Sequence, residues 1–250
     1  MNKELSRAIM VLGLLLAIGL AVAAFIFGAQ AKHLGAGRQS ISVKGLAEKP
    51  VTADYAEWTI GVQVNAPTFA DALAELRSRK PTLSQFLVRQ GFEQASQKEG
   101  NEDVEPNFVT ERTKNGEMEQ VQRGFNASQK IEVSSKDLQK MVLAHRAALQ
   151  LRAEGFPAQY GTPQYLVSDL EGKKMSLIGA ATENAQKRAQ EFAKYGKVKV
   201  GAMRSASQGA FYILPMGAVV DANEYGGSYD KSSIEKVARV VVTIEFNIAQ

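Results

Sequence analysis

The sequence contains no cysteine. A chain without thiols has no disulfide, no thiolate metal site and no cysteine nucleophile, so packing or assembly must supply its stability. Histidine is nearly as scarce: the only two are His33 and His145, and neither has a metal-ligating residue three or four positions away. We therefore expect no metal and no cofactor. We expect His145, on the apolar stripe of a helix, to be a partly buried packing residue rather than a catalytic base.

Sequence motifs for catalysis and nucleotide binding are also missing. The sequence has no Gly-x-Ser-x-Gly turn, no Walker pattern and no complete dinucleotide-binding glycine pattern. Carboxylate pairs have no fixed spacing, so they remain an alternative, although cap and strand-end roles suit these acids better. We expect a non-enzymatic protein. The alternative is an envelope ligand-binding protein or hydrolase that uses the loop from Tyr225 to Tyr229 or the carboxylates Asp54, Asp169, Glu171 and Asp221.

The charge is small and evenly distributed. The net charge is +4, from 30 basic and 26 acidic residues, which predicts no nucleic-acid surface. Residues 93–105 form a polar, acidic stretch that we expect to be a solvated loop. A calcium site is the alternative there, but the regular ligand spacing with a central glycine is missing.

One long hydrophobic segment is present, from Ala8 to Ala29, and it contains no charged residue. At about 1.5 Å per residue it would form a helix of about 33 Å, enough to cross a hydrocarbon core of about 30 Å. We therefore expect a transmembrane anchor over residues 8–29. Its representative apolar residues are Ala8, Leu12, Leu16, Leu20, Phe25 and Phe27.

The charges beside this segment predict its orientation. Lys3 and Arg7 lie in the arm of residues 1–7, which the positive-inside tendency keeps in the cytoplasm, although Lys32 and Arg38 weaken the asymmetry. We expect a single-pass protein of the inner (cytoplasmic) membrane, with a tether at residues 30–38 and a periplasmic domain at residues 39–250. A signal peptide cleaved near Ala31 is the alternative, but the apolar stretch exceeds the 7 to 15 residues typical of a signal peptide. Both interpretations export the domain.

Alternating or apolar runs in the exported part predict strands. The clearest is 54–64, where Trp58, Ile60 and Val62 alternate with polar residues. Asn115-Gly116 predicts a hairpin between two further strands. The predicted strands are 40–44, ended by Gly45, and 54–64, 104–113, 118–133, 160–168, 198–208 and 237–248, the last with Val240, Val242, Ile244, Phe246 and Ile248 on one face.

Three helices are predicted between these strands. The first begins at a Thr68–Asp71 capping box and ends at Gly91, with a kink or a break into two helices at Pro81. The second is capped by Ser134 or Ser135 and ends at Gly155, with Leu138, Met141, Val142, His145, Ala148 and Leu149 on one stripe. The third runs over 169–195 from a Ser168–Glu171 capping box, and its inward stripe is Ile178, Ala181, Ala185, Ala189 and Phe192. This order predicts an α+β, layered domain with mainly antiparallel sheets.

An uncharged and mostly apolar run, Gly209 to Val220, falls outside the predicted elements. Such a run must be covered by something, and in a chain without disulfides a second subunit is the economical cover. We therefore expect a homo-oligomer. The predicted interface residues are Phe211, Ile213, Met216, Val219 and Val220.

The order of several sequence motifs resembles the SIMPL-domain family of periplasmic and envelope proteins over nearly the whole exported part. The resemblance is carried by Ile41-Ser-Val-Lys-Gly45, Val51-Thr-Ala-Asp54-Tyr-Ala56, the alanine-spaced helix from Ala181 to Ala193, Lys199-Val-Gly201 and the closing strand from Val240. Ala53 stands where the family usually has proline. The resemblance implies an α/β fold, export, ring-like or channel-like oligomers in some members, and a link to oxidative-stress defence or envelope integrity. It carries over no catalytic residues and identifies no small-molecule ligand.

Overall fold

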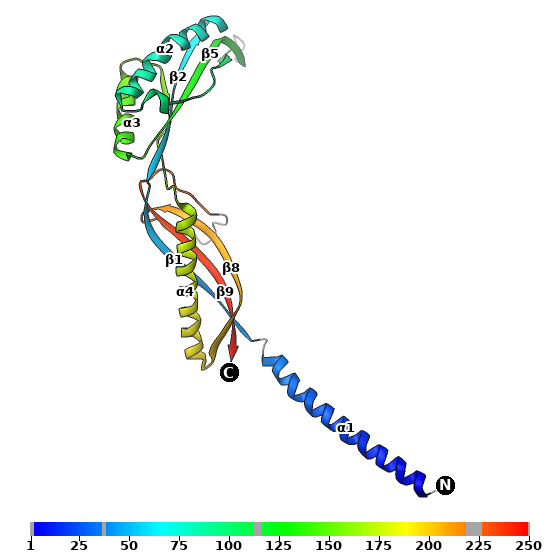
Figure 1. The fold of residues 1–250 in the computed structure, drawn as a ribbon. Coiled ribbons are helices and arrows are strands. Elements are labelled where there is room, and N and C mark those ends of the chain that lie inside the picture. Colours follow the sequence, from blue (N-terminus) through cyan, green and yellow to red (C-terminus); the bar gives the residue numbers. More distant parts are fainter. Residues whose placement is uncertain (1–2, 37–38, 113–116, 219–226, 250) are drawn as a thin grey trace. The chain divides into compact units, whose positions relative to one another are not determined.

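The computed structural model describes residues 3–36, 39–112, 117–218 and 227–249 of the 250-residue chain. The chain forms two compact units. The first unit comprises residues 1–48, 174–211 and 239–250, and the second comprises residues 49–173 and 212–238. Figure 1 shows helices and sheets in both, which confirms the predicted α+β class.

The second unit is built on a six-stranded sheet with the order β3-β5-β2-β6, in which β4 also pairs with β5 and β7 with β2. Its central strands β2 (Tyr55–Ala66) and β5 (Met118–Ser135) are antiparallel, with Ile60 opposite Ile131. The predicted alternation of β2 is confirmed, because Trp58, Ile60 and Val62 are buried. The shorter elements are η1 (Gln94–Ser96), β3 (Lys98–Glu99), β4 (Asp103–Arg112), β6 (Ala158–Tyr160) and β7 (Gln164–Leu166), where single strands or loops were predicted.

The helix α2 (Phe69–Arg89) packs on one face of this sheet. Its capping box is confirmed, since the Thr68 hydroxyl oxygen accepts a hydrogen bond from the Asp71 amide at 3.1 Å. Of the two alternatives predicted at Pro81, a kink or a break into two helices, the break is wrong, because Pro81 lies inside one continuous helix. Pro81 is exposed, so the carbonyl that loses its donor can bind water while Leu76 and Leu83 on either side stay buried. The helix ends at Arg89, and the predicted cap Gly91 follows in the left-handed conformation, with a φ of 85°.

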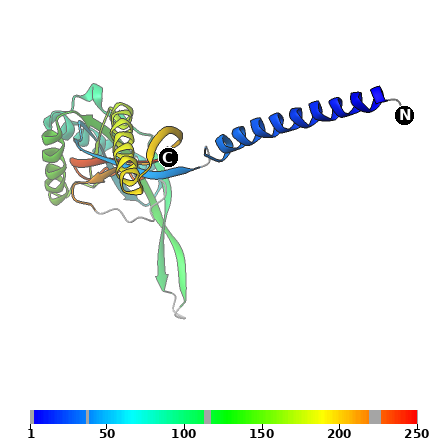
Figure 2. The same cartoon turned by 90° about the horizontal axis from the view of Figure 1, so that it is seen from below.

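The helix α3 (Leu138–Ala153) covers the same face. Its predicted cap is wrong: β5 continues through Ser135, and the Asp137 carboxylate accepts the hydrogen bond from the Lys140 amide. The buried stripe is Met141, Ala144, Ala148 and Leu151, whereas the expected Leu149 is 57% exposed. Figure 2 shows the β4–β5 hairpin projecting beyond both helices of its unit. The predicted turn residues Asn115 and Gly116 lie outside the described residues.

The first unit contains a three-stranded sheet of order β1-β9-β8, formed by β1 (Ser40–Thr52), β8 (Lys199–Pro215) and β9 (Glu235–Ala249). The predicted end of β1 at Gly45 is wrong. The strand continues because Gly45 is a packing position: a Cβ there would lie 2.0 Å from the Ala181 carbonyl oxygen. The predicted buried face of β9 is confirmed, with Val240, Val242 and Ile244 buried.

The helix α4 (Leu170–Gly196) lies along this sheet (Figure 1). Its buried residues are Leu177, Ala181, Ala185, Ala189 and Ala193, so the alanine stripe is confirmed, but Phe192 is 62% exposed and does not belong to it. The predicted Ser168–Glu171 capping box is also wrong. The Asp169 carboxylate accepts the hydrogen bond from the Gly172 amide instead.

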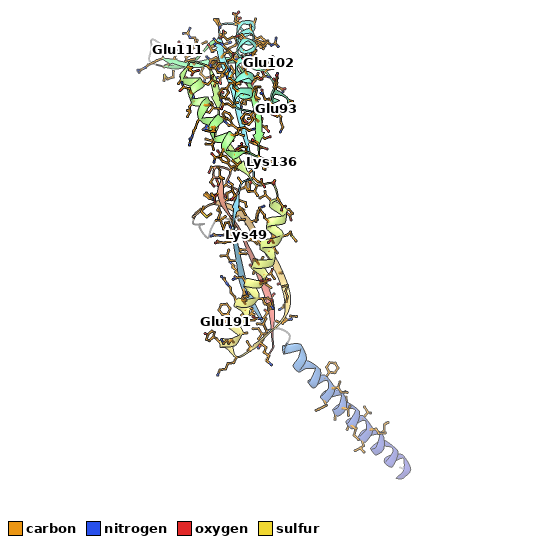
Figure 3. The ribbon with its side chains drawn as sticks, turned by 60° about the vertical axis from the view of Figure 1, so that its left-hand side comes forward. Lys49, Glu93, Glu102, Glu111, Lys136 and Glu191 are labelled. Carbon is orange, nitrogen blue, oxygen red and sulfur yellow. The ribbon has the colours of Figure 1, made fainter. Side chains whose placement is uncertain are left out.

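The chain begins with helix α1 (Lys3–Ala36), of which the structure describes the side chains of residues 12–28. The helix includes most of the segment 30–38 that we expected as a tether. Figure 3 draws its apolar side chains as sticks, and Leu16, Leu20, Phe25 and Phe27 are each more than half exposed. A search of the described residues finds no helix that is both long and apolar enough to cross a membrane.

Candidate functional site

Asp54, the first of the candidate catalytic carboxylates, is fully engaged in holding the fold. Its two carboxylate oxygens accept hydrogen bonds from the Ser168 amide at 2.8 Å and the Ser168 hydroxyl at 2.6 Å. Burial alone would raise the pKa of Asp54, but these bonds and the charge of Lys173 hold it below its usual value. The carboxylate therefore acts as a structural acceptor and is poorly suited to donate a proton.

Two of the other candidate carboxylates lie at the start of α4. Asp169 caps α4, and Glu171 lies in the first turn of that helix, where a negative charge is favourable. Asp221 lies outside the described residues. Within the described parts of the chain, no three histidine, aspartate or glutamate side chains are placed to hold a metal ion.

Part of the candidate loop from Tyr225 to Tyr229 is also held in place by hydrogen bonds. The Tyr229 hydroxyl oxygen accepts a hydrogen bond from the Val167 amide at 2.9 Å, and the backbone at Tyr229 pairs with Ile213 of β8. Tyr225 lies outside the described residues. The described end of the loop is therefore anchored to the second unit.

The structure also contains a buried ion pair that the sequence analysis missed. Lys236 is fully buried, and its Nζ donates to the Asp230 carbonyl at 2.6 Å and the Asp230 carboxylate at 3.1 Å. Ser232 and Ser233 donate to the same carboxylate. Burial would raise the pKa of Asp230, but the hydrogen bonds from Ser233, Ser232 and Lys236 hold it far below its usual value. The stretch Asp230-Lys-Ser-Ser233 is rich in turn-forming residues, a signal that could have indicated part of this cluster.

His145 occupies the structural role that the sequence favoured. Its ring lies edge-on to Trp58, with centroids 5.8 Å apart, and to Tyr160, with centroids 5.7 Å apart. It is half-buried. Such edge-to-face contacts stabilise a core, so His145 closes one end of the aromatic packing around Trp58.

The two edges of the three-stranded sheet differ in how their backbone groups are satisfied. At β1, the Asn184 side chain accepts from the Leu46 amide at 3.1 Å, and Arg188 donates to the Lys44 carbonyl at 3.0 Å. Both side chains come from α4, which therefore protects this edge as natural proteins commonly do. The β1 edge is closed to further strand pairing at these positions.

Among the described residues, the β8 edge has no comparable cover. Residues 201–209 are exposed throughout, although they form a continuous strand, and among the described strands they pair with β9. Gly201 lies against Asn247 and Gly209 against Val241, so the two strands run antiparallel. We call residues 201–209 the β8 edge.

The composition of the β8 edge suits close approach of another strand. It reads Gly-Ala-Met-Arg-Ser-Ala-Ser-Gln-Gly, with small side chains at most positions. Its one charged residue, Arg204, pairs with Glu245 of the neighbouring strand at 3.4 Å. Natural sheets usually protect an edge with charges, proline or a covering element, and this edge carries little of that protection.

The predicted interface residues beyond the β8 edge differ in how far they are buried. Phe211 is half-buried and Met216 is 52% exposed. Ile213 is fully buried, so its own chain already covers it. Val219 and Val220 lie outside the described residues.

In a comparison with protein-family models, residues 41–246 match the family described as SIMPL, protein of unknown function (DUF541). This segment begins in β1 and ends in β9 and takes in both units. A search of curated proteins found no match.

Proposed function

Because the chain belongs to the SIMPL family, we propose that it is a membrane-anchored envelope protein that assembles into a homo-oligomer and has no catalytic activity. Its copies join through the β8 edge. The exported domain lies in the periplasm, where the assembly supports envelope integrity or defence against oxidative stress, the roles that the family resemblance implies.

The uncovered β8 edge is the observation that supports assembly. A strand with unpaired backbone groups along one side is a template for pairing with another chain. Each amide–carbonyl bond formed there contributes about 0.5–1.5 kcal/mol, and several such bonds along residues 201–209 would offset part of the entropic cost of association. Six of the nine residues of the β8 edge are glycine, alanine or serine, so most positions leave room for that pairing.

The difference between the two sheet edges favours one arrangement. Because Asn184 and Arg188 occupy the β1 edge at Leu46 and Lys44, the β8 edge of one copy cannot pair with the β1 edge of another across these positions. It can pair with the β8 edge of a second copy about a two-fold axis, which is an isologous contact. That contact closes at two subunits. A larger, ring-like assembly requires a second surface, for which we propose Phe211, Met216, Val219 and Val220.

The proposed anchor is supported by the sequence of residues 8–29 and by the exposed side chains of α1. Phe25 and Phe27 are each 80% exposed. A helix that presents large apolar side chains to its surroundings is poorly suited to water and well suited to lipid. Anchoring every copy in one membrane raises the effective concentration of the domains and so promotes weak contacts between them.

The test is the size of the full-length chain extracted in mild detergent, measured by light scattering. We expect a uniform oligomer that retains residues 1–31 by mass spectrometry. The double variant Ala202→Lys/Ala206→Lys places charges on the β8 edge and should lose the β8 contact while its circular dichroism is unchanged. Ser42→Lys, an exposed position on β1, is the matched control and should assemble normally.

Two results would contradict the proposal. A wild-type monomer in detergent would rule out self-assembly, and a chain recovered without residues 1–31 would show a cleaved signal peptide instead of an anchor. If the double variant keeps the wild-type size, copies do not meet at the β8 edge.

A further inference from the structure

The second unit contains a cavity of about 540 Å³ beside the edge strand β6. Three elements supply its walls in addition to β6: the central strand β2, the strand β5 and the last turn of α3. Its lining residues are Thr59, Lys130, Arg152, Gln159, Tyr160 and Gly161.

Among the described residues, the lining carries two positive charges and no negative charge. Within the described residues, neither Lys130 nor Arg152 forms an ion pair or a side-chain hydrogen bond. The acid nearest to Lys130 along β5, Glu132, is paired with Lys98 at 3.1 Å. Two cations that share a cavity without a carboxylate raise the local concentration of anions.

The rest of the lining offers neutral hydrogen-bonding groups. Thr59 and Tyr160 contribute hydroxyls, and Gln159 contributes an amide whose nitrogen already donates to the Gln63 side chain. A lining of this kind is unsuited to an apolar ligand, because such a ligand would leave the polar groups without partners. It suits a ligand with several hydroxyls and one charged group.

We propose that this cavity binds a small organic anion, a polyhydroxylated molecule of monosaccharide size whose carboxylate or phosphate lies between Lys130 and Arg152. The volume falls within the range of about 300–1,000 Å³ that is usual for small-molecule sites. The guanidinium of Arg152 can hold two oxygens of either group, and Lys130 adds a second charge. The site is separate from the β8 edge, which belongs to the first unit.

The fluorescence of Trp58 can report ligand binding in this cavity. Trp58 is the only tryptophan in the sequence, and its indole nitrogen donates to the carbonyl of the lining residue Gly161 at 2.8 Å. Its ring also lies against Tyr160, another lining residue, with centroids 6.3 Å apart. A ligand that contacts Gly161 or Tyr160 should therefore alter the fluorescence of Trp58.

The experiment titrates the full-length chain in detergent with three sugars that share one scaffold: glucuronate, glucose 6-phosphate and glucose. Trp58 fluorescence and calorimetry are followed up to about 10 mM, a limit that covers millimolar affinities. We expect saturable binding of at least one charged sugar and none of glucose. The comparison of glucuronate with glucose 6-phosphate distinguishes a carboxylate from a phosphate ligand.

Variants then locate the site. Lys130→Gln and Arg152→Gln should each weaken binding by about tenfold or more, because each removes a charge-assisted contact. Arg146→Gln removes an exposed cation from the same helix α3, outside the cavity lining, and should bind like the wild type. The proposal is overturned if neither charged sugar binds, if glucose binds equally well, or if both cavity variants keep wild-type affinity.

Discussion

Replacing Gly45 by alanine tests the contact between α4 and the three-stranded sheet. The added Cβ would lie 2.0 Å from the Ala181 carbonyl oxygen and 2.8 Å from both the backbone nitrogen and the Cβ of Ala185. These are mostly backbone atoms of a helix, so no side chain can rotate away. The helix must move by more than about 1 Å before the oxygen contact reaches an ordinary separation.

The expected loss of stability is at the upper end of the usual range. Overpacking a core by one methyl group typically costs 1–3 kcal/mol. Here the required shift also strains two hydrogen bonds between α4 and β1, from the Leu46 amide to Asn184 and from Arg188 to the Lys44 carbonyl. We therefore expect Gly45→Ala to lower the free energy of unfolding by about 3 kcal/mol.

The matched control is Gly179→Ala in the same helix. A Cβ at Gly179 would have no atom within 4 Å, so alanine there adds only helix propensity, worth about 0.5–1 kcal/mol of stabilisation. The same chemical change thus has opposite expected signs at two glycines. Urea unfolding measures both, and hydrogen exchange of residues 177–193 locates the effect in α4. Equal stability of Gly45→Ala and the wild type would refute the close approach of helix and strand.

Two further variants test the second unit and the second assembly surface. Asp230→Asn leaves the buried Lys236 without its counter-charge and should destabilise the protein by about 3–5 kcal/mol in urea unfolding. Because the folded-state pKa of Asp230 lies below its ordinary value of 3.8, the ionised carboxylate contributes its full stabilisation at pH values well above 3.8. This stabilisation is lost as the pH falls below 3.8 and through the folded-state pKa. The variant should flatten that part of the acid unfolding profile, and an unchanged profile would contradict the ion pair. Val219→Asp combined with Val220→Asp should reduce a large assembly to the β8-linked dimer in light scattering with no change in circular dichroism, and a variant that keeps its full size would exclude that surface.

Local signals in the sequence were sufficient for most helices and strands. The period-two pattern around Trp58 gave the central strand β2, and the Thr68–Asp71 spacing gave the start of α2. Each of these features depends on residues within a few positions of one another. The alanine spacing of α4 was also readable, because small residues repeat on one helical face.

Several errors fall where a distant contact decides the local structure. Gly45 was taken as a strand end, but its role depends on Ala181, and the β1 edge is closed by residues more than one hundred positions away. Ser168 looked like a helix cap, yet Asp54 competes for its amide and hydroxyl. The β8 edge could not be identified from the sequence either, because the spacing of apolar residues does not reveal that both faces of a strand are uncovered.

The absence of cysteine allows a direct test of how two β8 edges would meet. Single cysteines introduced at Ala202, Ser205, Ala206 and Ser207 report one position each, because no native thiol competes. In a two-fold antiparallel contact, one residue near the axis faces its own copy at about 4.5–5.5 Å between Cα atoms, which is within the range for a disulfide. A residue two positions away is separated from its own copy by about 14 Å along the strands and cannot be bridged.

Oxidative cross-linking in detergent should therefore peak sharply at one position of the β8 edge. Efficient linking at every second position would mean that the two strands run parallel, and the isologous antiparallel contact would be wrong. If β8 instead joined β1, single cysteines on β8 would not link to themselves, whereas a mixture of the Ala206→Cys and Ser42→Cys chains would form a heterodimer. That outcome would require α4 to move away from the β1 edge, because Asn184 and Arg188 hold its backbone groups.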